Sequence, residues 1–211
     1  MNFVSEEIEK YSTIHSESES ELLKKLYRET HLNVLNPRMI SGPLQGRILS
    51  FISKIINPNK ILEIGTFTGY STLCLAEGLK KNGTIQTIEK NDELIEIQNK
   101  YFEKSSYRKN IFQFTGNALQ ILPTLNEKYD LIFLDADKKN YLIYLDLLIP
   151  KLKRKGILIT DNVLWNGKVL NKMKDKDSQI IHNYNKKVNS DKRLNSVILP
   201  IRDGITFSMK I

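Results

Sequence analysis

From residue 60 onwards, short apolar segments alternate with longer segments that have helical spacing. The short segments are KILEI (60–64), TIQTIE (84–89), IFQFT (111–115), DLIFL (130–134) and GILIT (156–160). Parallel strands cannot be joined by tight turns, and a helix is their usual crossover connection. The alternation therefore predicts an α/β protein with a doubly wound, mostly parallel sheet and helices on both faces.

The two ends of the chain depart from this alternation. Residues 1–56 favour helices, notably over SESESELLKKLYRETHL (16–32) and GPLQGRILSFISKII (42–56). The last segment, SVILPIRDGITFSMKI (196–211), is typical of two strands joined by a short turn. We therefore expect a seven-stranded sheet that is completed by an antiparallel C-terminal hairpin.

The length of 211 residues predicts a single domain over 1–211, with N-terminal helices (1–56) and a Rossmann-like core (60–211). No apolar run approaches the ~20 residues of a membrane span. The N-terminus MNFVSEEIEKYS is too acidic and polar for a signal peptide, and the single cysteine, Cys74, fits a reducing compartment. The expected location is the cytoplasm, with no membrane association.

Polar residues stand where the predicted strands end, which is the edge where ligands bind in open α/β sheets. These residues are Glu63 and Gly65 for the first strand, Glu89 for the second, Asp135 and Asp137 for the fourth, and Asp161 and Asn162 for the fifth. Their shared position predicts a site at the carboxyl edge of the sheet.

The segment EIGTFTGYS (63–71) predicts a nucleoside site that lacks a pyrophosphate. Gly65 and Gly69 allow a tight turn before a helix, but their spacing differs from the G-x-G-x-x-G that holds a pyrophosphate. Glu89 is placed to accept hydrogen bonds from two ribose hydroxyls, and Glu63 would favour a cationic group. S-adenosylmethionine has these features, although a simple strand–turn–helix connection also explains the glycines.

Asp135, Asp161 and Asn162 are candidate metal ligands because they end neighbouring strands, which lie ~4.8 Å apart. Two carboxylates and an amide oxygen suit a hard cation, with Mg²⁺ expected first and Ca²⁺ or Mn²⁺ as alternatives. A strand-end cap at Asp135 and an Asx turn at Asp161 would explain each acid separately. Lys138 follows closely, and a nearby cation would lower the pKa of its amine and make it a candidate base.

Six segments together resemble the cation-dependent O-methyltransferases of the caffeoyl-CoA and catechol group, in their compact bacterial form. They are MISGPLQG (39–46), ILEIGTFTGYST (61–72), TIEKN (87–91), FLDADKKNY (133–141), GILITDNVLWNG (156–167) and LPIRDGIT (199–206). They occur in family order from about residue 20 to the end of the chain. FLDADK followed by DNVLW-x-G is specific to this group, whereas many methyltransferases share the glycine loop.

The resemblance implies the roles of individual residues. The implied metal ligands are Asp135, Asp161 and Asn162, with Lys138 as the base; Lys138, Asp135 and Asn162 form the catalytic set. The implied cofactor contacts are Met39, Ser41, Glu63, Gly65, Phe67, Tyr70, Ser71, Glu89, Ala118, Asp135 and Asp137. The substrate would contact Trp165, Lys138 and Tyr141. The sequence departs from the family at Phe67, which suggests a backbone contact, and at Lys90 and Leu119, which would flank the adenine.

The resemblance also implies a homodimer and methyl transfer from S-adenosylmethionine to a catechol-like or other vicinal-diol aromatic acceptor. The net charge of +8 leaves an RNA methyltransferase as an alternative, because phosphates attract lysines regardless of sequence. No basic motif interleaved with aromatic residues supports nucleic-acid binding. A nicotinamide-dependent oxidoreductase would share the fold but needs the missing pyrophosphate fingerprint, and a non-catalytic binding module would have no use for Lys138 beside paired metal ligands.

Overall fold

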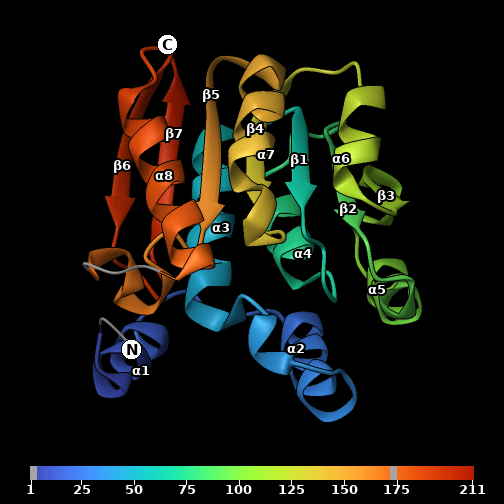
Figure 1. The fold of residues 1–211 in the computed structure, drawn as a ribbon. Coiled ribbons are helices and arrows are strands. Elements are labelled where there is room, and N and C mark those ends of the chain that lie inside the picture. Colours follow the sequence, from blue (N-terminus) through green and yellow to red (C-terminus); the bar gives the residue numbers. More distant parts are fainter. Residues whose placement is uncertain (1–3, 172–174) are drawn as a thin grey trace.

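The computed structural model describes residues 4–171 and 175–211, and it contains a seven-stranded sheet with the order β3-β2-β1-β4-β5-β7-β6 (Figure 1). The strands are β1 (Lys60–Ile64), β2 (Thr84–Glu89), β3 (Ile111–Thr115), β4 (Tyr129–Leu134), β5 (Leu152–Asp161), β6 (Leu194–Leu199) and β7 (Ile205–Lys210). Only β7 runs antiparallel to both of its neighbours. The predicted Rossmann-like fold with a C-terminal antiparallel hairpin is confirmed.

Helices cover both faces of the sheet (Figure 1). The α-helices are α1 (Glu6–Ile14), α2 (Glu21–Asn33), α3 (Gly42–Ile56), α4 (Tyr70–Ala76), α5 (Ile95–Glu103), α6 (Ala118–Ile121), α7 (Tyr141–Leu148) and α8 (Lys176–Ser190). Short 3-10 helices add η1 (Pro37–Met39), η2 (Asp92–Leu94), η3 (Arg108–Asn110), η4 (Leu122–Thr124), η5 (Lys138–Asn140), η6 (Ile149–Lys151) and η7 (Trp165–Leu170). Among the residues that the structure describes, no helix combines the length and apolarity of a membrane span.

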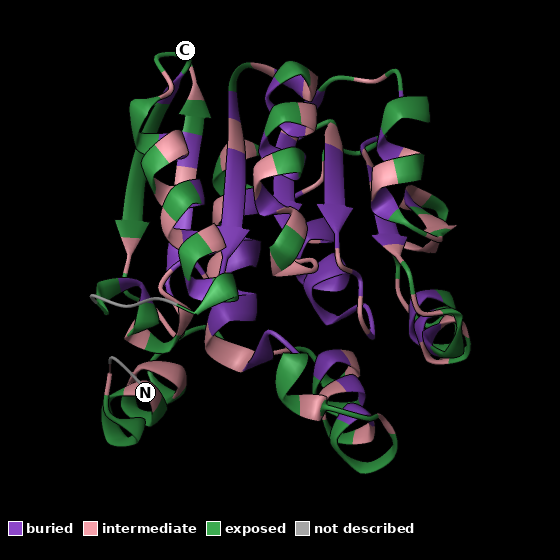
Figure 2. Ribbon diagram, viewed as in Figure 1, coloured by how far each residue is buried: buried purple, intermediate pink, exposed green. Residues whose placement is uncertain are grey.

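Successive side chains of each central strand point to opposite faces, so the sheet separates two apolar cores. Leu62 and Ile64 of β1 pack into the core beneath α6, α7 and α8, whereas Ile61 packs into the core beneath α2, α3, α4 and α5. The central strands are buried along most of their length (Figure 2). This double burial explains why their sequences are almost continuously apolar.

Two elements differ from the sequence-based expectation. Strand β5 begins at Leu152, before the predicted segment 156–160, and its pairing with β4 shifts register between Tyr129 and Leu131. Helix α8 was not predicted, because charged and amide side chains dominate its sequence. It begins at Lys176, directly after the N-cap Asp175, whose carboxylate accepts a hydrogen bond from the Ser178 N–H, and it buries an apolar stripe that includes Ile181 and Tyr184.

The strand order reverses between β1 and β4, whose outer neighbours are β2 and β5. The register aligns Ile64 at the end of β1 with Ile88 of β2 and Leu134 of β4, and aligns Leu134 with Thr160 of β5. Four carboxyl ends therefore meet at one edge of the sheet. This edge is the topological switch point where open α/β sheets bind their ligands.

Candidate active site

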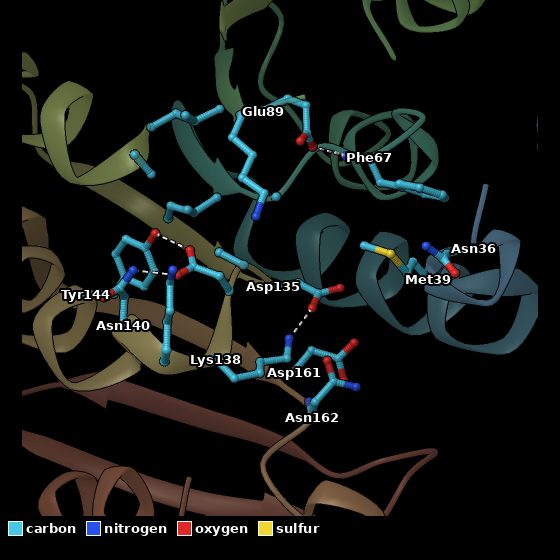
Figure 3. Close-up of a pocket in the computed structure, with 18 of the residues that line it drawn as sticks. Asn36, Met39, Phe67, Glu89, Asp135, Lys138, Asn140, Tyr144, Asp161 and Asn162 are labelled. Carbon is cyan, nitrogen blue, oxygen red and sulfur yellow. Dashed lines mark hydrogen bonds and ion pairs between the residues drawn. The ribbon is translucent and has the colours of Figure 1, made fainter. Parts of the chain in front are cut away.

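A cavity of about 950 Å³ lies at this edge of the sheet (Figure 3). Each of the four central strands contributes to its wall through Gly65, Glu89, Asp135 or Asp161. The segment before α3 closes the cavity from another side with Met39. All the strand-end residues that the sequence singled out line this cavity except Glu63.

The Glu89 carboxylate organises the glycine loop at one end of the cavity. Its Oε2 accepts a hydrogen bond from the backbone N–H of Phe67 at 2.7 Å (Figure 3). Its Oε1 accepts one from the N–H of Asn91 at 2.9 Å. Gln98 donates to the Phe67 carbonyl at 2.6 Å, which anchors the loop from below. Each carboxylate oxygen keeps a lone pair for a ligand, so Glu89 can accept bonds from vicinal hydroxyls.

Two acids and an amide meet at the opposite end, beside Lys138 (Figure 3). Lys138 Nζ lies 2.7 Å from Asp135 Oδ1, and the Lys138 charge also acts on Asp161. Burial, and next the charge of Asp135, raise the pKa of the Asp161 carboxyl to about 6. Asn162 follows in a left-handed conformation (φ 59°), and its side chain lines the same cavity.

These side chains have the chemistry that a hard divalent cation requires. Asp161 Oδ2 accepts from Gln45 Nε2 at 2.7 Å and Oδ1 accepts from the Asn162 N–H at 2.8 Å, which leaves further lone pairs on both oxygens. Among residues 4–171 and 175–211, no three His, Cys, Asp or Glu side chains group as a metal site. The set at this edge has only two carboxylates, and its third oxygen is an amide. Asp135, Asp161 and Asn162 therefore fit Mg²⁺ or a similar cation.

Tyr141 lies beneath Lys138 and does not line the cavity. Its hydroxyl accepts a hydrogen bond from Lys138 Nζ at 2.8 Å and donates to the Asp161 carbonyl at 3.0 Å. The side chain is fully buried, and burial raises its pKa well above the usual value, so the hydroxyl keeps its proton. Tyr141 thus supports Lys138 from outside the cavity lining, and its expected contact with the substrate stays a prediction.

Glu63 is also fully buried and lies outside the cavity lining, so its expected contact with a cationic ligand group stays a prediction. Its carboxylate accepts hydrogen bonds from Ser71 and Thr87, each at 2.6 Å, and from Thr72. Burial is the main cause that raises the pKa of Glu63 to about 7. Glu63 thus joins β1 to β2 and to the start of α4.

Three further residues that were expected to contact the cofactor lie outside the cavity lining. Ser71 is bound to Glu63, and the Tyr70 hydroxyl donates to Glu19 beneath the N-terminal helices. Ser41 is 6 % exposed, and its carbonyl accepts a hydrogen bond from Arg202. These three side chains are thus engaged within the protein, and the expected cofactor contacts of the three residues stay predictions.

The remaining expected residues line the cavity. They are Met39, Gly65, Phe67, Glu89, Ala118, Asp135, Asp137, Lys138, Asp161, Asn162 and Trp165. Asp137 accepts from the Tyr144 hydroxyl at 2.7 Å and from Asn140, so it is held in place without a cation (Figure 3). Lys90 also lines the cavity, whereas Leu119 packs against the apolar core.

Gln45 and Arg202 were missed as site residues. Gln45 is fully buried on α3 and contacts Asp161 across 116 residues of sequence. Arg202 lines the cavity from the turn between β6 and β7 and bonds to Gln45 at 2.5 Å. Both stand inside the segments MISGPLQG and LPIRDGIT, so their place in those motifs was the only signal.

Sequence comparison matches residues 13–211 to the family described as O-methyltransferase. A caffeoyl-CoA O-methyltransferase from Stellaria longipes is 33 % identical over 205 residues, which cover 92 % of this chain and 85 % of that protein. Caffeoyl-CoA O-methyltransferase 1 from Nicotiana tabacum is 36 % identical over 206 residues, which cover 92 % of this chain and 86 % of that protein.

Solved structures of O-methyltransferases superpose on this chain over almost its whole length. The O-methyltransferase from Bacillus cereus in complex with S-adenosylhomocysteine (SAH) superposes with a TM-score of 0.90 at 26 % identity, over 97 % of both chains. The O-methyltransferase TomG from Streptomyces achromogenes, in complex with S-adenosylmethionine, superposes with a TM-score of 0.86 at 26 % identity, over 95 % of this chain and 94 % of that one.

Proposed function

This chain belongs to the O-methyltransferase family, and we propose that it methylates a hydroxyl of a catechol-like or other vicinal-diol aromatic acceptor at a bound divalent cation. The observation that carries the proposal is the convergence of Asp135, Asp161, Asn162 and Lys138 on the cavity that also holds Glu89. One end of that cavity suits a nucleoside and the other suits a cation. An acceptor bound between the two ends would contact both the methyl donor and the cation.

Glu89 and the glycine loop support S-adenosylmethionine as the methyl donor. The carboxylate is already oriented by the N–H groups of Phe67 and Asn91, so its free lone pairs can receive the ribose hydroxyls without rearrangement. Asp137, whose carboxylate is oriented by Tyr144, is the expected partner of the methionine end. The Bacillus cereus and Streptomyces achromogenes relatives were crystallised with SAH and S-adenosylmethionine.

Asp135, Asp161 and Asn162 would hold the cation, which we expect to be Mg²⁺ or alternatively Ca²⁺ or Mn²⁺. When bound there, a divalent cation would lower the pKa of the acceptor hydroxyl. The burial of Asp161 supports this role, because Lys138 supplies one positive charge to two neighbouring carboxylates and a bound cation would compensate the second.

Lys138 is the proposed base. Its Nζ is held by Asp135 and by the Tyr141 hydroxyl, both less than 3 Å away. A second positive charge at the same oxygens would favour the neutral amine, which can accept a proton. The acceptor hydroxyl would give its proton to Lys138 Nζ, and its oxygen would form a bond to the methyl carbon while the carbon–sulfur bond breaks. The sulfonium charge disappears in this step, and SAH leaves as a neutral thioether.

The test is methylation of a panel of small catechols with S-adenosylmethionine, detected by mass, with Mg²⁺ and again with EDTA. The proposal expects product with Mg²⁺, none with EDTA, and recovery when excess Mg²⁺ is added back. Equal product in EDTA would remove the cation from the mechanism but leave methyl transfer. Monophenols that match each catechol are the acceptor control, and equal turnover of both would contradict the preference for vicinal diols.

We further propose that the protein acts as a cytoplasmic homodimer on small molecules and not on nucleic acid. Exposed apolar side chains on α1 and α3, among them Tyr11 and Phe51, support a self-association surface. The RNA alternative predicts binding that weakens steeply with salt. Light scattering after size exclusion tests the dimer, and RNA binding measured at two salt concentrations tests the alternative. No finding favours the oxidoreductase alternative.

A further inference from the structure

Arg202 joins the C-terminal hairpin to the start of α3. Its Nη1 donates to Gln45 Oε1 at 2.5 Å and to the Ser41 carbonyl, and its Nη2 donates to the Ile40 carbonyl at 3.3 Å. The residue itself adopts a left-handed conformation (φ 49°), in the turn between β6 and β7. Three acceptors on one segment therefore fix the guanidinium at the wall of the cavity.

This bond determines which way the Gln45 amide faces. A guanidinium has donors only, so the oxygen of the Gln45 amide must be the atom that faces Arg202. The amide nitrogen must then face the other way, where it lies 2.7 Å from Asp161 Oδ2. Gln45 is fully buried, so no solvent competes for either end of the amide.

The same arrangement orients the Asp161 carboxylate. The positive charge of Arg202 lies at the oxygen end of the Gln45 amide dipole, and the negative charge of Asp161 lies at its nitrogen end. Each charge is therefore attracted to the end of the dipole that it contacts. The second carboxylate oxygen, Oδ1, accepts from the Asn162 N–H at 2.8 Å. Hydrogen bonds to both oxygens leave the carboxylate little freedom to rotate. Its remaining lone pairs are thereby kept in a constant direction.

We propose that Gln45 is a positioning residue for Asp161 as a cation ligand, and that Arg202 acts on the cation through Gln45. The inference rests on the proposed function, because the role of Asp161 as a ligand belongs to it. Groups that orient metal ligands are typically worth about 10- to 100-fold in metal affinity. Gln45 and Arg202 would therefore control cation affinity without touching the cation or the methyl donor.

The competing explanation is that Arg202 only fastens the hairpin to α3. Two variants separate the explanations. Gln45→Met keeps the length of the buried side chain but removes the donor to Asp161, whereas Arg202→Met leaves that donor in place and releases the amide. Arg154→Met is the matched control, because Arg154 is exposed on β5 and its replacement removes the same charge.

The experiment measures Mn²⁺ binding to the full-length chain by electron paramagnetic resonance, together with SAH binding by calorimetry and the melting temperature. We expect Gln45→Met to raise the Kd for Mn²⁺ by about 10- to 100-fold and Arg202→Met to raise it less. SAH affinity should stay at the wild-type value in both. Arg154→Met should match the wild type in all three measurements.

An unchanged Mn²⁺ Kd in Gln45→Met would overturn the inference, and so would parallel losses of Mn²⁺ affinity, SAH affinity and melting temperature. If Gln45→Met does not fold, the same three measurements on Arg202→Met decide whether the inference stands. A wild-type protein that binds SAH but not Mn²⁺ would instead overturn the cation part of the proposed function. Measuring the wild type first therefore distinguishes the two failures.

Discussion

The carbonyl oxygen of Asp135 occupies the place where any side chain on Gly65 would begin. A Cβ added to Gly65 would lie 1.9 Å from that oxygen, and Gly65 has a φ of +102°. The Asp135 N–H donates to the Ile64 carbonyl at 2.9 Å, which ties the ends of β1 and β4 together. This contact places the glycine loop directly beside the first of the proposed cation ligands.

Gly65→Ala should therefore push the ends of β1 and β4 apart and displace Asp135 within the site. The positive φ alone costs about 1–3 kcal/mol for a residue with a side chain, and the clash with backbone adds to it. We expect a large fall in melting temperature and loss of Mn²⁺ binding. Gly116→Ala is the control for the melting temperature, because Gly116 has a positive φ (+139°) but its added Cβ would approach no atom closer than 3.4 Å. Equal losses in the two variants would contradict the role of the Asp135 contact.

Glu89→Ala should weaken binding of SAH by at least about tenfold, since hydrogen bonds to a charged acceptor are worth about 1.5–3 kcal/mol. The variant loses the proposed ribose partner and also frees the N–H groups of Phe67 and Asn91. Calorimetric titration with SAH measures the effect. Glu103→Ala, at the end of α5 and away from the cavity, removes the same charge and should bind SAH like the wild type. A Glu89 variant of wild-type affinity would place the ribose elsewhere.

The fold and the strand-end residues could be predicted because both depend on local patterns. Apolar runs of strand length locate β1 to β5, and the carboxyl end of a strand is a position in sequence as well as in space. Asp135 and Asp161 follow from that rule without any knowledge of contacts. The hairpin of β6 and β7 was equally local, because its turn carries Asp203 and Gly204.

The residues that were missed, and those that lie outside the cavity lining, depend on contacts that no local pattern shows. Gln45 meets Asp161 across 116 residues and Arg202 across 157. Glu63 stands one residue before the end of β1, and strand alternation turns its side chain towards the start of α4 and away from the cavity. Tyr141 directly follows FLDADKKN, and α7 begins there and buries its side chain outside the cavity lining.

Glu63 should make stability depend on pH. Burial raises its pKa from the usual 4.5 to about 7, so the folded chain holds a proton that the unfolded chain has already lost between these values. Stability from this group is present below the lower pKa and is lost as pH rises through the upper one. Glu63→Gln removes this titration. The free energy of unfolding of the variant, measured relative to that of the wild type, should therefore rise by about 3 kcal/mol as the pH is raised from about 5 to about 8.

Urea unfolding of both proteins across that pH range measures the difference. Glu7→Gln, at the exposed start of α1, is the control for loss of a carboxylate. A constant difference between Glu63→Gln and the wild type would mean that Glu63 ionises normally inside the fold.

Tyr141→Phe should reduce turnover more than substrate binding. The hydroxyl holds Lys138 Nζ at 2.8 Å but does not line the cavity, so kcat should fall about tenfold for one lost hydrogen bond to a charged group, with KM unchanged. Tyr129→Phe is the matched control, because it removes another buried hydroxyl, which donates to Gln86 at 2.5 Å at the start of β4, the opposite end of that strand from Asp135. Equal kcat values in the two variants would reduce Tyr141 to a packing role.

Lys138→Met gives the most direct test of the proposed base. Loss of a positioned general base lowers kcat by about 10²- to 10⁴-fold. Mn²⁺ binding should not weaken, because the variant removes the ammonium that lies 2.7 Å from Asp135 and competes with a cation for the same oxygens. Lys186→Met, exposed on α8, removes the same charge elsewhere and should keep wild-type kcat. Full turnover in Lys138→Met would show that the acceptor reacts without this base, whereas lost turnover together with lost Mn²⁺ binding would show that Lys138 organises the cation site instead.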